Sequence, residues 1–248
     1  MSVAAALDTV LCRLSDVQLA TLAGACEPLA RPSPVCATAL AGASPAALDA
    51  VRELTAAWDA DPAITGAGVA LALRVGAGAR RQSQHNRPRP VWTGPGALGE
   101  QRLTAAVLHE LLARAEDRIL LVSFAAHTLP TVAADLRAAV ARGCQVDVVF
   151  ENSQDSDGRY RGYDHAFATI DGITRWRWPA EQREGGGVLH AKLLVIDGQR
   201  ALIGSANLTQ QALSANLEVG LAVADPGVAA ALESHIRGLM RSGVLAPA

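Results

Sequence analysis

One segment of the chain holds the side chains that phosphoryl transfer needs, at short spacing. In chain order these polar residues are His190, Lys192, Asp197, Ser205, Asn207 and Glu218. An imidazole attacks phosphorus well, and an ammonium group, a hydroxyl and an amide stabilise the oxygens on which negative charge develops. The segment 189–220 therefore predicts a site that cleaves or transfers phosphodiesters.

Lys192 is unusual in the composition of this chain. It is the only lysine, because the other 21 of the 22 basic residues are arginine. A lysine that persists against such a bias indicates a position that arginine does not serve, because an ammonium is a compact point charge and a guanidinium is a planar fork. Lys192 is therefore a candidate catalytic residue.

Local patterns predict how this segment folds. The apolar run 188–197 predicts a strand, on which His190 and Lys192 point to the same face. Asp197 followed by glycine is typical of a hairpin turn, and the chain then returns through 201–203. Asn207 is expected near the start of a helix, where free backbone amides favour phosphate.

The spacing HxK-x4-D-x6-GSxN, from His190 to Asn207, resembles the signature of the phospholipase D superfamily. The resemblance implies that His190 forms a phosphohistidine and that a second, protonated imidazole donates to the leaving oxygen. It implies that Lys192, Ser205 and Asn207 hold the phosphoryl oxygens. Glu218, in an N-x-E element, would orient His190. The resemblance implies no metal ion and no other cofactor.

Two points stay open within this motif. In the family the aspartate supports the motif from a distance, so Asp197 is either catalytic or a turn residue. The family mechanism also uses two HxK motifs, and this chain has one, since neither His109 nor His127 has a lysine partner. The resemblance is therefore to short single-motif members, which implies a homodimer with one active site across its two-fold axis.

The rest of the chain predicts an α/β protein with a phospholipase D-like fold, a mixed β-sheet flanked by helices. Strands are expected at 91–92, 118–124 and 144–150, and helices at 102–116 and 130–142. We expect two regions: a helical N-terminal region with a basic linker at 1–85, and a phospholipase D-like catalytic domain at 86–248. Within the first region Ser15 and Ser44 start helices. The Gly-, Pro- and Arg-rich run 76–90 predicts the linker.

Basic and aromatic residues alternate before the motif and suggest a nucleic-acid track. The candidate binding residues are Arg159, Arg161, Arg175, Trp176, Arg177 and Trp178. Alternating rings and guanidinium groups suit single-stranded nucleic acid, but a half-buried strand explains the same alternation. Because the net charge is −2, any contact with nucleic acid must come from local patches of this kind.

The chain has a single HxK motif, a helical N-terminal region, a W-T-G-P strand from Trp92 and the core LHAKLLVIDG…LIGSANLT from Leu189. With these features the chain as a whole resembles the phospholipase D-like component of the bacterial DISARM anti-phage system. This implies a metal-independent phosphodiester hydrolase, a nuclease acting on DNA in antiviral defence beside other defence subunits. Two alternatives remain open: a phospholipase or phosphatidyl transferase, and a non-catalytic subunit that binds nucleic acid. Because the sequence indicates neither a signal peptide nor a membrane helix, we expect a cytoplasmic protein without a membrane partner.

Overall fold

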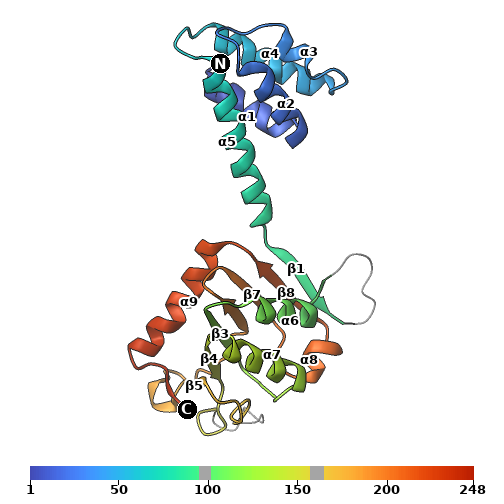
Figure 1. The fold of residues 1–248 in the computed structure, drawn as a ribbon. Helices are drawn as coiled ribbons and strands as arrows, with labels where there is room; N and C mark the ends of the chain where they lie inside the picture. Colours follow the sequence, from blue (N-terminus) through green and yellow to red (C-terminus); the bar gives the residue numbers. More distant parts are fainter. Residues whose placement is uncertain (95–101, 157–164) are drawn as a thin grey trace. The chain divides into compact units, whose positions relative to one another are not determined.

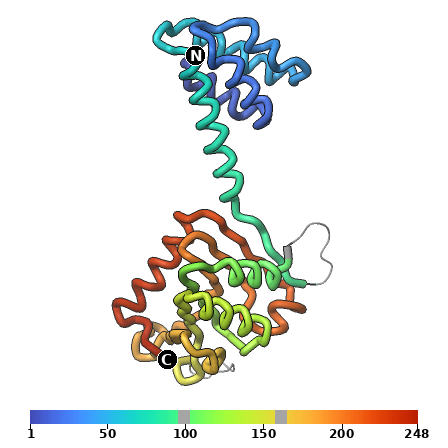
Figure 2. Tube along the Cα trace, viewed as in Figure 1, coloured from blue at the N-terminus to red at the C-terminus, as the bar shows by residue number. Residues whose placement is uncertain are grey.

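The computed structural model describes residues 1–94, 102–156 and 165–248 (Figures 1 and 2). The predicted nucleic-acid contacts Arg159 and Arg161 lie outside these residues. The chain divides into two compact units, Met1–His85 and Asn86–Ala248. Within the described ranges, none of the helices is long and apolar enough to cross a lipid bilayer.

The first unit is helical. Its helices are α1 (Val3–Arg13), α2 (Asp16–Cys26), α3 (Val35–Thr38), α4 (Pro45–Asp59) and α5 (Gly66–His85). Ser15 and Ser44 cap α2 and α4 as predicted, and Ser15 forms a capping box with Gln18. Trp58 lies fully buried in the core of this unit.

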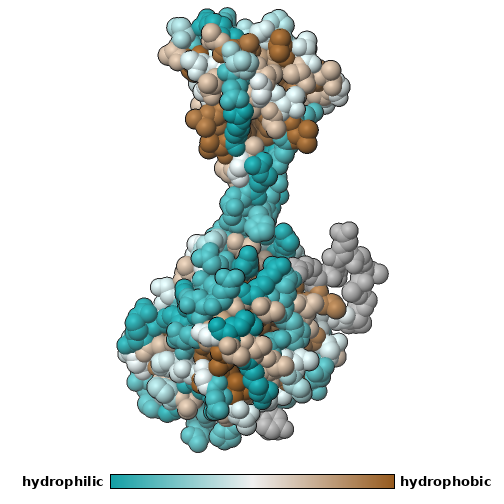
Figure 3. Space-filling model, in the orientation of Figure 1, coloured by the Kyte–Doolittle hydropathy of each residue, from teal (hydrophilic) through white to brown (hydrophobic). Residues whose placement is uncertain are grey.

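The predicted linker at 76–90 is wrong for its first ten residues, because α5 continues to His85. Glycine costs about 1 kcal/mol in a helix, but tertiary contacts outweigh this propensity. Arg80 donates to the carbonyl oxygens of Leu11 and Leu14, and Gly76 leaves space for the Leu11 side chain. The last five residues of α5, 81–85, are polar and solvent-exposed (Figure 3).

The second unit is built on one mixed sheet, with nine strands among the described residues in the order β2-β1-β8-β7-β6-β3-β4-β5-β9. The strands are β1 (Arg89–Thr93), β2 (Arg102–Leu103), β3 (Arg118–Ser123), β4 (Gln145–Phe150), β5 (Ile173–Arg177), β6 (Leu193–Ile196), β7 (Arg200–Gly204), β8 (Glu218–Val223) and β9 (Ala246–Pro247). The helices are α6 (Thr104–Arg114), α7 (Pro130–Ala141), α8 (Gln210–Ser214) and α9 (Pro226–Arg241), with a 3-10 turn at Ala180–Gln182. Parallel strands β3, β4 and β5 adjoin the antiparallel run β3-β6-β7-β8-β1.

Helices cover both faces of this sheet (Figure 1). Alternate residues of β3 show this clearly. Leu121 packs in one core cluster with Leu112 of α6 and Leu136 of α7. Its neighbour Leu120 packs in a second cluster with Ile236 of α9. The predicted α/β class, a mixed sheet flanked by helices, is therefore confirmed.

Candidate active site

The motif residues gather at one edge of the sheet. Strands β8, β7, β6 and β3 are antiparallel neighbours in that order. The start of β6 therefore lies beside the ends of β7 and β3 and the start of β8. Lys192 immediately precedes β6, Ser205 follows β7, and Glu218 opens β8. Sheet pairing thus brings together residues that are separated by up to 26 positions in the chain.

His190 and Lys192 meet at the ring of Phe124, which follows β3. The His190 imidazole is exposed, and its centroid lies 5.0 Å from that of Phe124. Lys192 Nζ lies 5.5 Å from the same centroid and donates to the His190 carbonyl oxygen at 2.7 Å. In the part of the chain that the structure describes, the His190 ring makes no hydrogen bond. The nucleophile predicted from the motif is thus accessible.

The expectation that both residues lie on a strand is wrong. Strand β6 begins only at Leu193, where its regular pairing with β3 and β7 starts; before it, the Lys192 carbonyl accepts one bond, from the Gly204 N–H of β7 at 3.2 Å. His190 is exposed and Lys192 is 9% exposed, so the two differ in burial. Phe124 was not predicted, since its only signal is an aromatic residue at the end of an apolar strand.

The environment of Lys192 changes its acidity. Burial lowers the pKa of its ammonium group, and the negative charge of Glu218 partly opposes this change. A carboxylate therefore helps to keep the buried lysine protonated.

Glu218 is held by its own hydrogen bonds. Ser205 Oγ donates to Glu218 Oε2, and Asn216 Nδ2 donates to Oε1 at 3.0 Å. Ser205 is fixed in turn by Val219, whose N–H donates to Ser205 Oγ at 3.1 Å. The role implied by the resemblance, in which Glu218 orients His190, is not seen in the single chain, where Glu218 binds Ser205 and Asn216.

Asn207 fixes the segment that carries Phe124. Its Oδ1 accepts from the Ala125 N–H at 3.3 Å. The Leu208 N–H donates to the Ala125 carbonyl at 3.0 Å, and the His127 N–H donates to the Leu208 carbonyl at 2.8 Å. Asn207 lies just before Thr209, the cap of α8, near a helix start as predicted.

A small cavity adjoins this edge. Lys192, Gly204 and Ala206 line it together with side chains of the sheet, α6 and α8. Most of its remaining lining is apolar, and Ser123 and Thr104 contribute hydroxyl groups. Lys192 and the residues on both sides of Ser205 therefore share one hollow.

Asp197 is not part of this group. It lies at the opposite end of β6, in the turn to β7, with a φ of 55°. Its carboxylate accepts from the backbone N–H groups of Glu116, Asp117 and Arg118 at 2.9–3.3 Å. The hairpin turn is confirmed, and the structure gives Asp197 the role of fixing the start of β3.

The described members of the predicted nucleic-acid track have partners inside the protein. Trp176 Nε1 donates to Asp147 at 2.8 Å, and Arg177 donates to both carboxylate oxygens of Asp155. Trp178 stacks under the Arg183 guanidinium, 5.1 Å from its ring centroid. Arg175 is half-buried on the same strand. The alternation thus falls on a half-buried strand, and contact with nucleic acid by these residues stays a prediction.

Comparison with known protein families finds one that matches this chain. The model described as "Cardiolipin synthase, PLD-like domain" matches residues 108–240, more than half of the chain. Cardiolipin synthase A of Yersinia pseudotuberculosis serotype O:1b (strain IP 31758) is 29% identical over 143 residues, which are 56% of this chain. The match spans only 28% of the length of that relative.

Nuc, a solved structure, shows the same fold. Nuc of Salmonella typhimurium, a phospholipase D family member, superposes with a TM-score of 0.51 at 18% identity, over 65% of this chain and 97% of Nuc. NucT of Helicobacter pylori gives a TM-score of 0.49 at 17% identity, over 63% of this chain and 98% of NucT. The likeness to Nuc confirms the predicted fold class.

Proposed function

The chain belongs to the phospholipase D-like domain family described for cardiolipin synthase, and from that premise we propose a metal-independent phosphodiesterase that reacts through a phosphohistidine on His190. The observation that carries the proposal is the pairing of an exposed imidazole with a buried ammonium on one aromatic ring. A nucleophile must be accessible, and a charge that stabilises phosphoryl oxygens acts most strongly away from water.

The proposed reaction has two steps. A ring nitrogen of His190 attacks phosphorus, the bond from phosphorus to the leaving oxygen breaks, and a second, protonated imidazole gives its proton to that oxygen. Water then attacks the phosphohistidine, the neutral imidazole takes the proton of the water, and the phosphorus–nitrogen bond breaks. Lys192 stabilises the charge on the non-bridging oxygens, with Ser205 and Asn207 beside it.

The second imidazole comes, in this proposal, from a second copy of the chain. An apolar strip adjoins the site on the same sheet face as α9, in the part that α9 does not cover. The exposed residues of this strip are Trp92, Leu103, Val219 and Leu221. Trp92 pairs with Val219, which binds Ser205 through its backbone. A homodimer packed on this strip would bring the two sites together.

Mixing experiments test the shared site. Wild type and His190→Ala are unfolded together, refolded at varied ratios, and assayed on bis(4-nitrophenyl) phosphate, a general phosphodiester. If both copies of His190 are required, activity falls as the square of the wild-type fraction. A linear fall at a fixed total concentration of chains would show that each chain works alone and would reject the shared site.

We propose DNA as the substrate, in line with the resemblance of the whole chain to DrmC, the phospholipase D-like protein of DISARM defence. The test is cleavage of labelled single- and double-stranded oligonucleotides in EDTA by wild type, His190→Ala and the control His235→Ala, which changes an exposed histidine on α9. EDTA-resistant cutting that only His190→Ala abolishes supports a nuclease. Absence of cutting by folded wild type on every strand contradicts it.

Phosphatidyl transfer is the second candidate, and the description of the matching family as cardiolipin synthase favours it. Incubation with phosphatidylglycerol vesicles, followed by lipid analysis, separates it from a nuclease. A third reading is a non-catalytic, nucleic-acid-binding subunit of a defence complex. That reading predicts that His190→Ala leaves phage protection in cells unchanged.

A further inference from the structure

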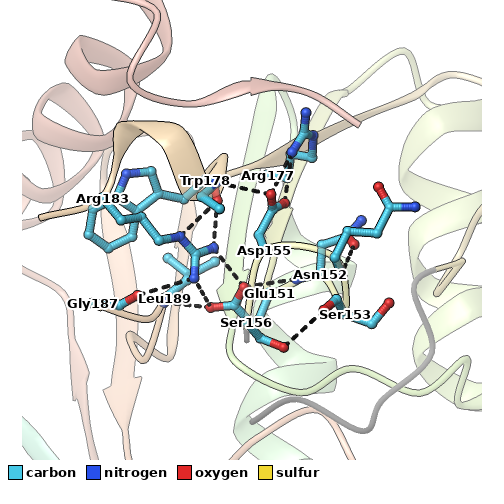
Figure 4. Close-up of polar contacts among 12 residues, drawn as sticks. Glu151, Asn152, Ser153, Asp155, Ser156, Arg177, Trp178, Arg183, Gly187 and Leu189 are labelled. Carbon is cyan, nitrogen blue, oxygen red and sulfur yellow. Dashed lines mark hydrogen bonds and ion pairs between the residues drawn. The ribbon is translucent and has the colours of Figure 1, made fainter. Parts of the chain in front are cut away.

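A buried ion pair ties the segment that leads to His190 to the end of β4 (Figure 4). Glu151 follows β4, and Arg183 follows the 3-10 turn at Ala180–Gln182. Arg183 Nη2 lies 2.7 Å from Glu151 Oε1, and the two side chains are 3% and 0% exposed. Neither residue was predicted from the sequence, because a single carboxylate after a strand and an arginine 32 positions later carry no joint signal.

The hydrogen bonds of this pair are complete. The five N–H groups of Arg183 donate to both oxygens of Glu151, to the carbonyl of Trp178 and to that of Gly187. Besides Arg183, Glu151 accepts from the N–H groups of Asn152 and Leu189. Only a guanidinium has the planar fork that makes these bonds at once.

One of these bonds reaches the residue next to His190. The Leu189 N–H donates to Glu151 Oε2 at 2.7 Å, and the Leu189 side chain is buried in the core. The chain before it, Gly185–Gly187, has positive φ at its first two residues and no side chains to anchor it. Glu151 and Arg183 therefore supply buried polar anchors on the N-terminal side of His190.

We propose that the Glu151–Arg183 pair positions His190 for attack on phosphorus, an inference that rests on the proposed function. The pair touches no reacting atom in this proposal and acts through the backbone of Leu189 and Gly187. A buried ion pair adds little net stability compared with apolar residues of the same volume. What it supplies here is orientation, since backbone groups of three chain segments, at 152, 178 and 187–189, converge on two side chains.

The test compares two isosteric changes in the full-length protein, one in β4 and one at the residue that follows β4. Glu151→Gln disrupts the pair, and the control Asp147→Asn disrupts the buried contact of Asp147 with Arg237, which does not touch residues 187–190. On bis(4-nitrophenyl) phosphate we expect Glu151→Gln to lower kcat on the order of 10- to 100-fold with KM within about twofold. Asp147→Asn should leave kcat within about twofold of wild type. Equal losses in the two variants would overturn the inference.

Hydrogen exchange gives a readout that does not depend on activity. In Glu151→Gln the amide of Leu189 should exchange faster than in wild type, and in Asp147→Asn it should not. If wild type cleaves no phosphodiester, the proposed function fails, and exchange alone then decides whether the pair anchors this segment. An unchanged exchange rate of the Leu189 amide in Glu151→Gln would overturn the inference. Arg183→Lys, which keeps the charge but loses the fork, replaces Glu151→Gln if that variant does not fold.

Discussion

At the scale of single residues, Lys192 lowers the stability of the fold in a position where its charge serves the proposed reaction. Burial lowers the pKa of its ammonium group from the ordinary value of 10.5, and Glu218 partly opposes the change. A cation buried in this way costs folding free energy while it stays protonated. The native state then binds fewer protons than the unfolded state in the interval between the lowered pKa and 10.5, so stability rises with pH in that interval.

We predict that Lys192→Met separates these two effects. The variant should lose on the order of 1000-fold in kcat, because a group that stabilises the phosphoryl oxygens is gone. Urea unfolding at several alkaline pH values should show wild type gaining stability relative to Lys192→Met as pH rises toward 10.5. A constant difference across this range would contradict the lowered pKa.

Asp197, in contrast, stabilises the fold. Its carboxylate accepts three backbone N–H groups at the start of β3. Removing it in Asp197→Ala leaves these donors without their acceptor, and we expect a loss of about 2–3 kcal/mol in unfolding free energy. The kcat of the folded fraction should stay within about twofold of wild type.

Asp197→Asn is the matched control, because asparagine tolerates the positive φ and keeps one acceptor oxygen. It should lose less stability than Asp197→Ala. A large loss of kcat in well-folded Asp197→Asn would instead show that the carboxylate takes part in the reaction.

At the scale of elements, α9 depends on charges buried beneath it. Arg237 donates to Asp147 of β4 at 2.9 Å and to Glu233 at 2.7 Å, and Glu233 also accepts from Arg118 of β3. Arg237→Met leaves Asp147 without its ionic partner, so we expect a loss of about 3 kcal/mol in urea unfolding. The control Arg241→Met changes an exposed arginine of the same helix and should be nearly neutral. Equal effects would show that α9 is held by apolar contacts alone.

The same cluster makes α9 sensitive to acid. Burial alone would raise the pKa of Glu233, but hydrogen bonds from Arg118 and Arg237 outweigh it and hold that pKa below its ordinary value. This contribution to stability is therefore full above the pKa of the unfolded chain and is lost as pH falls through the lowered pKa.

The sequence predicted most strongly the elements whose signals are local. The apolar runs that became β3 and β4, and the helix that became α7, agree with the structure to within one residue at each end. Predictions failed where distant contacts decide. Arg80 keeps α5 helical through a glycine-rich stretch, and the start of β6 depends on where its neighbours stop pairing. Local propensity does not contain these contacts.

At the scale of the whole molecule, the residue types of the site were predictable from the sequence, but the residues that hold them in place were not. The motif lies within 29 residues of chain, so its spacing carries the chemistry. Phe124 and the Glu151–Arg183 pair come from earlier segments, and only the antiparallel order of the sheet brings Phe124 to His190. A motif specifies which groups react, and the fold decides how each is held.

The two units have separate cores, and each core contains buried cysteines whose reaction with an alkylating reagent can measure its opening. Cys26 and Cys36 lie in the first core with their sulfur atoms 3.6 Å apart, and Cys144 lies in the second. Burial, together with Cys36, raises the pKa of the Cys26 thiol to about 12. At neutral pH none of these buried thiols should react with an alkylating reagent until its own core opens, while exposed Cys12 should react at once.

We therefore predict that the second unit unfolds by itself. Pulsed alkylation along a urea series, read by mass spectrometry, should give one midpoint for Cys26 and Cys36 and another for Cys144. The midpoint for Cys144 should be the same within error in the full chain and in a fragment of residues 86–248, since every apolar neighbour in its core lies within that fragment. A lower midpoint in the fragment would mean that the helical unit stabilises the domain that carries His190, and truncation would then weaken the site along with the fold.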